Sequence, residues 1–180
     1  IHFRTAEVDP ASYAAALEQA RLGITDPADD YVAPFSGATN EQNFWYQFFV
    51  VQRAGYIRPN PTFVALLTSR SDPRRTYYFN AAGTNLSSTL LALDYAQPLV
   101  SAKENLLNWA EAAYRTGAQP EARTQLNAER ALWAAEGITL PAVTASGPEL
   151  LREILTERYI ALFQTYEPYE QYKRTCFPNV

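Results

Sequence analysis

The fold is decided by a stretch in the second half of the chain, residues 101–117, which read SAKENLLNWAEAAYRTG. Ser101 and Glu104 have the spacing of a capping box, in which the serine caps the first backbone N–H groups of a helix. Apolar residues then recur at helical spacing: Leu106, Trp109, Ala110 and Ala113. Arg115-Thr-Gly117 is a stop signal. The pattern predicts an amphipathic helix that begins after Ser101 and ends near Gly117.

A second helix follows after a short turn. Pro120-Glu121 is a helix start, and the predicted inner face carries Ala122, Leu126, Ala128 and Leu132. Two helices joined by a glycine-containing turn form an αα-hairpin of the tetratricopeptide (TPR) type. We expect Trp109 and Trp133 to lie in its core. Only one such pair is evident, and a stack needs several, so its partners must come from elsewhere in the chain or beyond it.

The last predicted helix begins at a second capping box, Ser146-Gly-Pro-Glu149. Its apolar stripe is broad enough to be buried on two sides: Leu151, Ile154, Leu155, Arg158, Tyr159, Leu162 and Phe163. Pro168 is expected to bend or end this helix. Tyr169 and Tyr172 would continue its aromatic face as packing groups.

The first half is less regular. Asp9 and Pro10 predict a helix start, and Gly23 predicts its end, so the segment 1–23 is helical. Residues 24–98 form a loop-rich segment, which is typical of functional regions when it is ordered. Within it, Asn43–Val51 favours an extended conformation, with a short helix as the alternative. Pro61 opens a short helix that ends near Ser69.

The same segment contains two further local features. Residues 76–79, TYYF, are compatible with a short strand. Arg70, Arg74 and Arg75 form the densest basic cluster of the chain, which we interpret as a solvated turn because Asp72 interrupts it. Ala81–Ser88 is small and polar, and predicts a loop.

Composition excludes several classes of function. Apolar residues make up 47% and charged residues 19%, which is typical of a globular protein. The formal net charge of −4 disfavours a nucleic-acid role. His2 is the only histidine and Cys176 the only cysteine, so the usual Ser-His-Asp and Cys-His pairs would depend on His2. We expect no catalytic residues, no metal site and no cofactor, and a buried, inert Cys176.

Four blocks of the sequence resemble the SusD/RagB family. Residues 154–163, ILTERYIALF, followed by EPYEQYKRT at 167–175 and Phe177-Pro178, are similar to the last helix and ending of that family. Residues 106–117 resemble its AEA..R.G helix, and 71–74, SDPR, its NDPR turn. Residues 35–46 are similar to the loop before that turn. The chain departs from the family pattern at Pro168-Tyr169, where a second aromatic residue is usual, and at Lys173-Arg174, where Arg-Arg is usual.

The resemblance implies a single-domain fragment of a SusD-like fold, mainly α, with a TPR-like superhelix, long irregular loops and little β-structure over residues 1–180. It implies a lipoprotein on the extracellular face of the outer membrane, which holds glycans or peptides for a TonB-dependent SusC-like transporter. The chain contains no methionine and both ends look cut. We therefore expect it to be part of a longer protein, with the lipid anchor before Ile1 and a further segment after Val180.

The family resemblance transfers no binding residue, so the ligand site must be predicted from chemistry. The best place for a sugar is the loop carrying Asn40, Asn43, Trp45 and Tyr46, where an aromatic ring can stack on a pyranose and amides can satisfy its hydroxyls. The alternative is that these aromatic residues only pack the loop onto helices. Glycoside hydrolysis uses a pair of carboxylates, and two such pairs occur here: Asp29 with Asp30, and Glu149 with Glu153. Pairs of this kind are common on surface turns and helices.

Two other functions stay open at this point. One is a helical-repeat scaffold in which the hairpin grips a partner protein, and the other is an enzyme. The charged pair Glu167 and Arg174 is interpreted as a structural ion pair or capping pair, because the two residues lie on either side of the turn after Pro168.

Overall fold

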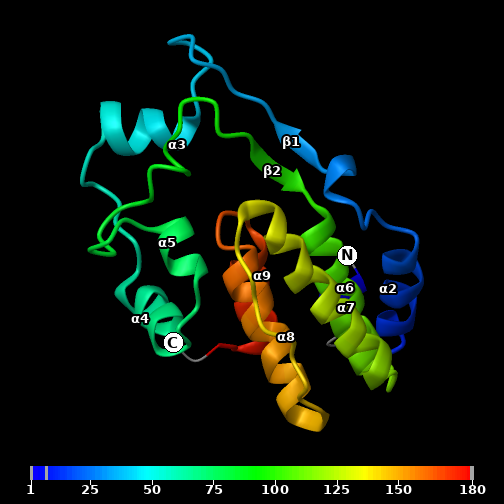
Figure 1. Cartoon of the computed structure of the whole chain (residues 1–180). Coiled ribbons are helices and arrows are strands. Elements are labelled where there is room, and N and C mark those ends of the chain that lie inside the picture. Colours follow the sequence, from blue (N-terminus) through cyan, green and yellow to red (C-terminus); the bar gives the residue numbers. More distant parts are fainter. Residues whose placement is uncertain (1, 7, 179–180) are drawn as a thin grey trace. The chain divides into compact units, whose positions relative to one another are not determined.

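The computed structural model describes residues 2–6 and 8–178 (Figure 1). It is 55% helix and 5% strand, which confirms the mainly α class. Where the sequence suggests one domain, the structure divides into two compact units. Unit 1 contains the described residues up to Tyr31 and those over 100–178, and unit 2 contains Val32–Leu99. Unit 2 thus coincides closely with the loop-rich segment predicted over 24–98.

Unit 1 is a cluster of helices around one apolar core. Its elements are α1 (His2–Thr5), α2 (Ser12–Arg21), the 3₁₀ turn η1 (Pro27–Asp29), α6 (Ala102–Arg115), α7 (Gln119–Leu132), the 3₁₀ turn η3 (Trp133–Glu136), α8 (Gly147–Ala161) and α9 (Glu167–Thr175). The predicted hairpin is α6 and α7, and both helices also contact α8. The core residues Leu107, Leu126 and Ile154 are completely buried. A repeated superhelix stays a prediction.

The cap of α6 is confirmed, but the predicted cap of α8 is wrong. Ser101 Oγ accepts a hydrogen bond from the Glu104 backbone N–H at 3.1 Å. Ser146 makes no such bond with its side chain. The chain enters α8 through Gly147 in the left-handed region (φ +58°), and the Gly147 N–H donates instead to Gln119 Oε1 of α7 at 2.9 Å. The start of α8 is therefore fixed by a tertiary contact.

The end of the chain differs from the prediction in three ways. The helix ends at Ala161, and Pro168 lies in the first turn of a separate helix, α9, so Pro168 starts a helix and does not bend one. Tyr169 and Tyr172 are 58% and 50% exposed, because Gln171 occupies the buried face of α9. Cys176 caps the C-terminal end of α9 with its backbone in the left-handed region, and it is exposed. The expected burial of Cys176 is therefore wrong.

Unit 2 is built from short elements joined by turns. They are α3 (Phe44–Tyr46), the π-helical stretch η2 (Gln47–Gln52), α4 (Pro61–Ser69) and α5 (Arg74–Tyr78). Strands β1 (Tyr31–Ala33) and β2 (Gln97–Val100) pair where the chain enters and leaves the unit. The helix over 61–69 is confirmed. The favoured extended conformation of 43–51 is wrong and its helical alternative is correct; the strand over 76–79 is also wrong.

Local capping and ring packing explain the helical conformation of 43–52. The Asn43 side chain accepts the Trp45 backbone N–H at 2.9 Å and so starts α3. The rings of Trp45 and Phe49, four residues apart, then pack at 5.9 Å on one side of the helix. Tertiary packing of this kind overrides the preference of aromatic and β-branched residues for strands.

The basic cluster is not a solvated turn, because Arg74 is completely buried. Its Nε and Nη2 donate to the two carboxylate oxygens of Asp72 at 2.9 and 2.7 Å. The Asp72 carboxylate also accepts the Arg74 backbone N–H at 2.9 Å. The Asp-Pro-Arg turn thus holds a buried ion pair, Asp72 with Arg74, in unit 2.

Candidate binding pocket

A polar pocket of about 510 Å³ lies in unit 1. Its walls come from α1, α6, α8 and α9, and its lining residues are Phe3, Arg4, Glu104, Asn108, Arg158, Glu167, Glu170, Gln171, Lys173 and Arg174. Nearly all of them are charged or carry an amide. A pocket of this size accommodates a small ligand.

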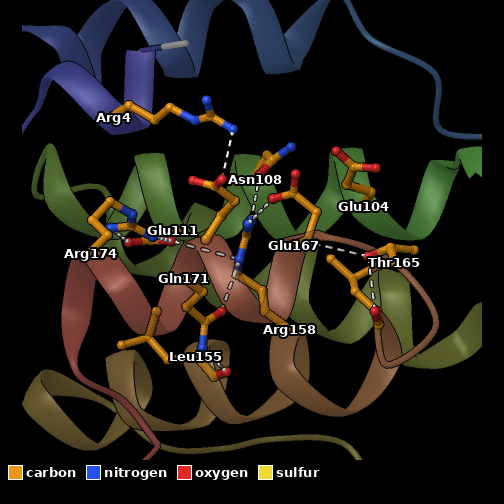
Figure 2. Close-up of polar contacts among 12 residues, drawn as sticks. Arg4, Glu104, Asn108, Glu111, Leu155, Arg158, Thr165, Glu167, Gln171 and Arg174 are labelled. Carbon is orange, nitrogen blue, oxygen red and sulfur yellow. Dashed lines mark hydrogen bonds and ion pairs between the residues drawn. The ribbon is translucent and has the colours of Figure 1, made fainter.

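Arg158 of α8 is the buried centre of the pocket wall (Figure 2). Its Nε donates to Gln171 Oε1 at 3.2 Å and its Nη2 to Glu167 Oε2 at 3.1 Å, both on α9. Its Nη1 donates to Asn108 Oδ1 on α6. The Arg158 guanidinium group therefore links α8 to α6 and α9, and the fixed planar geometry of its donors orients the three helices.

A second buried charged residue, Glu111 of α6, contacts two arginines of the pocket wall. Arg174 Nη1 and Nη2 donate to its two oxygens at 2.6 and 2.7 Å, and Arg158 Nε lies 3.9 Å from Glu111 Oε2. Burial lowers the pKa of Arg174, but the hydrogen bonds and charge of Glu111, together with Tyr13, outweigh burial and raise that pKa above its ordinary value. The guanidinium groups of Arg158 and Arg174 also lie over the Phe3 ring, at 5.7 and 5.1 Å from its centroid.

Three polar groups in the pocket have no hydrogen bond to any residue that the structure describes. They are the Glu104 carboxylate, the Asn108 amide nitrogen and the Lys173 ammonium group, whose one ring contact is with Tyr169 at 6.0 Å. Figure 2 shows Glu104 beside this network with no dashed line to it. Burial raises the pKa of Glu104, the nearby Glu167 raises it further, and Arg158 partly opposes both. An acceptor and two donors are thus available to a ligand.

The residues predicted as the ligand site all lie in unit 2 and do not line this pocket. Asn40 is exposed and Tyr46 half-buried. Trp45 Nε1 donates to Gln97 Oε1 at 2.8 Å. Asn43 is completely buried, and its amide nitrogen donates to the carbonyls of Leu90 and Ala92 at 2.7 and 3.1 Å. The role of Asn43 is therefore structural, because its amide hydrogens are already used inside the unit.

The other charged residues singled out in the sequence have different partners from those expected. Glu167 and Arg174 do not pair with each other; Glu167 binds Arg158 and Arg174 binds Glu111. Glu149 makes only an exposed pair with Arg152 at 3.5 Å. Asp30 accepts the Ala102 N–H at 2.6 Å, at the start of α6. Neither Glu149 nor Asp30 lines the pocket.

No family model matches the sequence, and no curated protein matches it. Over residues 2–6 and 8–178 there is no group of three or more His, Cys, Asp or Glu side chains able to hold a metal ion. No helix in this described part of the chain is long and apolar enough to cross a bilayer.

The raised pKa of Glu104 leads to a stability prediction. The folded state holds the Glu104 proton more tightly than the unfolded state, so wild type loses stability as pH rises from the ordinary glutamate pKa through the raised one. Glu104→Gln removes this loss and should make the protein more stable than wild type at pH 7. The difference should shrink as pH falls below the ordinary range. Urea unfolding of both proteins at several pH values measures it, and equal stabilities at pH 7 would contradict it.

Proposed function

We propose that this chain belongs to a non-catalytic cell-surface protein that binds an oligosaccharide, and that the polar pocket of unit 1 is its sugar site. The observation that carries the proposal is the set of unbonded groups, Glu104, Asn108 and Lys173, on a wall fixed by Arg158. Sugar hydroxyls both donate and accept hydrogen bonds, so they need acceptors and donors on one rigid surface. Asn108, whose Oδ1 is held by Arg158, is preorganised and loses little entropy on binding.

The wider proposal is a SusD/RagB-like nutrient-binding lipoprotein. It would face outward from the outer membrane through a lipid anchor outside this chain, and deliver glycan to a TonB-dependent SusC-like transporter. The convergence of the blocks supports it: Glu111 of the AEA..R.G block, and Arg158, Glu167 and Arg174 of the last block, form one connected network. Arg158 and Glu111 lie 47 positions apart in the sequence, and they would be expected to meet if these blocks form one structural unit.

A glycan array followed by isothermal titration calorimetry tests the sugar site. We expect the array to retain at least one oligosaccharide, and Glu104→Gln to weaken its binding by about tenfold or more, because a charged acceptor is lost. Glu149→Gln is the matched control, since Glu149 is an exposed glutamate on α8 outside the pocket. Retention of no glycan, or equal affinities of Glu104→Gln and wild type, would reject the pocket as the sugar site.

A second candidate function, a protein-binding helical scaffold, is favoured by one observation. Tyr166, at 80% exposed, stands with the exposed Tyr169 and Tyr172 at intervals of three residues from the start of α9. Exposed tyrosines are enriched in protein interfaces. Retention of peptides but no glycans on arrays would select this function, and turnover of an arrayed oligosaccharide would select an enzyme.

A further inference from the structure

Unit 2 contains a separate pocket of about 760 Å³ between α4 and the loop 82–84. The α4 wall is apolar because this helix has apolar residues on two faces. Phe63 and Leu67 are buried inside unit 2, whereas Pro61, Val64 and Ala65 line the pocket. A helix that is apolar on its outward face is typically covered by another group.

The opposite wall is held firmly in place. The Asn80 side chain accepts the Thr84 backbone N–H at 2.9 Å, and Arg75 Nη2 donates to the Ala81 carbonyl at 3.0 Å. Gly83 approaches α4 so closely that a Cβ there would lie 2.8 Å from Val64 Cγ1. The loop therefore has a defined position against α4, and the pocket is preformed.

The polar groups that line this pocket are few, and most of them already form hydrogen bonds within the chain. Thr68 Oγ1 donates to the Val64 carbonyl at 2.8 Å, and Ser69 Oγ to the Leu66 carbonyl at 3.0 Å. Asn60 caps α4 by accepting the Thr62 N–H at 2.9 Å. A polyol would leave most of its hydroxyl groups unsatisfied here. The occupant must therefore have an apolar body.

The charge at the pocket is positive. Arg58 is the only charged residue among those lining it, is exposed, and has no hydrogen bond or ion pair with a residue that the structure describes. Unit 2 carries five arginines against three acidic residues, although the chain as a whole has an excess of acidic residues. The acidic residue nearest in sequence, Asp72, is bound to buried Arg74. The free guanidinium group therefore faces no competing carboxylate from the pocket lining.

We propose that this pocket binds a small amphiphilic carboxylate. Its aliphatic or aromatic body covers the Val64 and Ala65 face of α4, and its carboxylate accepts hydrogen bonds from the Arg58 guanidinium group, whose planar donors match a carboxylate in pairs. The site is distinct from the sugar pocket in its residues and in the chemistry of its ligand. If this carboxylate site is rejected, the sugar proposal is unaffected, and rejection of the sugar site leaves the carboxylate proposal unaffected.

Titration of the ¹⁵N-labelled chain with octanoate tests the site. We expect amide shifts confined to α4 and the loop 80–85, and octanoate to bind at least about tenfold more tightly than octanol, because a charged hydrogen bond is added. Arg58→Gln should weaken octanoate binding about tenfold or more and leave octanol binding unchanged. Arg53→Gln is the matched control, an exposed arginine of unit 2 that does not line the pocket.

Three results would overturn the proposal. Equal affinities for octanoate and octanol would mean that the pocket has no preference for a carboxylate. Undiminished octanoate binding by Arg58→Gln, with a well-dispersed spectrum that proves folding, would remove Arg58 from the site. Absence of shifts in α4 and the loop, or shifts spread over unit 1, would place binding elsewhere or exclude it.

Discussion

Glu111→Ala is expected to lower the free energy of unfolding of unit 1 by about 3–5 kcal/mol, because it leaves buried positive charges without their partner. Glu111 is completely buried on α6 and is bound through both oxygens to Arg174. Arg115 Nη2 lies 3.6 Å and Arg158 Nε 3.9 Å from the same carboxylate. Removal of this carboxylate therefore leaves the largely buried Arg174 without its ionic partner and removes a negative charge 3.9 Å from Arg158 Nε.

Residue-resolved hydrogen exchange measures this effect, since it follows the two units separately where a single unfolding curve would not. Amides of α6, α8 and α9 should lose protection, while those of unit 2 should change little. Glu149→Ala, which removes an exposed pair on α8, is the control and should cost about 0–1 kcal/mol. A cost for Glu111→Ala as small as that of the control would show that the network contributes nothing to stability.

Arg74→Ala should destabilise unit 2 by a similar amount, about 3–5 kcal/mol, because the largely buried Asp72 carboxylate would lose its bidentate bond to the Arg74 guanidinium group. Hydrogen exchange of α4 and α5 measures the loss. The double variant Asp72→Ala/Arg74→Ala should cost less than the sum of the two single variants, since both residues belong to one pair.

Arg53→Ala is the control for this prediction, because Arg53 is exposed and its polar contacts in the described part of the chain are with the Tyr56 ring, at 5.8 Å, and the Gln52 carbonyl. It should change protection in unit 2 by little. Additive costs for the Asp72 and Arg74 variants would contradict the interpretation of the turn as a coupled buried pair.

Helices with local start signals could be predicted from the sequence. Ser101, Pro61 and Asp9 each lie within a few residues of the helix start they mark, and the structure has α6, α4 and α2 there. Residues 43–52 could not be predicted in this way, because their propensity favours strands. Their helical form depends on ring packing and on the bond from Trp45 to Gln97, a residue 52 positions away.

The candidate pocket could not be predicted from the sequence. The family-like blocks contain Arg158, Glu167 and Arg174, but the pattern gives these residues no binding role and does not give their partners. The sequence predicts only a helix-capping role for Glu104, and its backbone N–H does donate to Ser101 Oγ. Its side chain becomes a pocket group because α8 and α9 bring Arg158 and Glu167 toward it, and no local spacing encodes that arrangement.

The pairing of β1 with β2 has a consequence for how this protein can evolve. Unit 2 lies between two segments of unit 1 in the sequence, and the strands at its ends are hydrogen-bonded neighbours. Doubling the length of a flexible loop between fixed ends costs only about 0.6 kcal/mol of closure entropy. Insertions and deletions in the exposed turns of residues 34–96 can therefore be accommodated while the helices of unit 1 are inherited unchanged, and the two pockets are free to diverge at different rates.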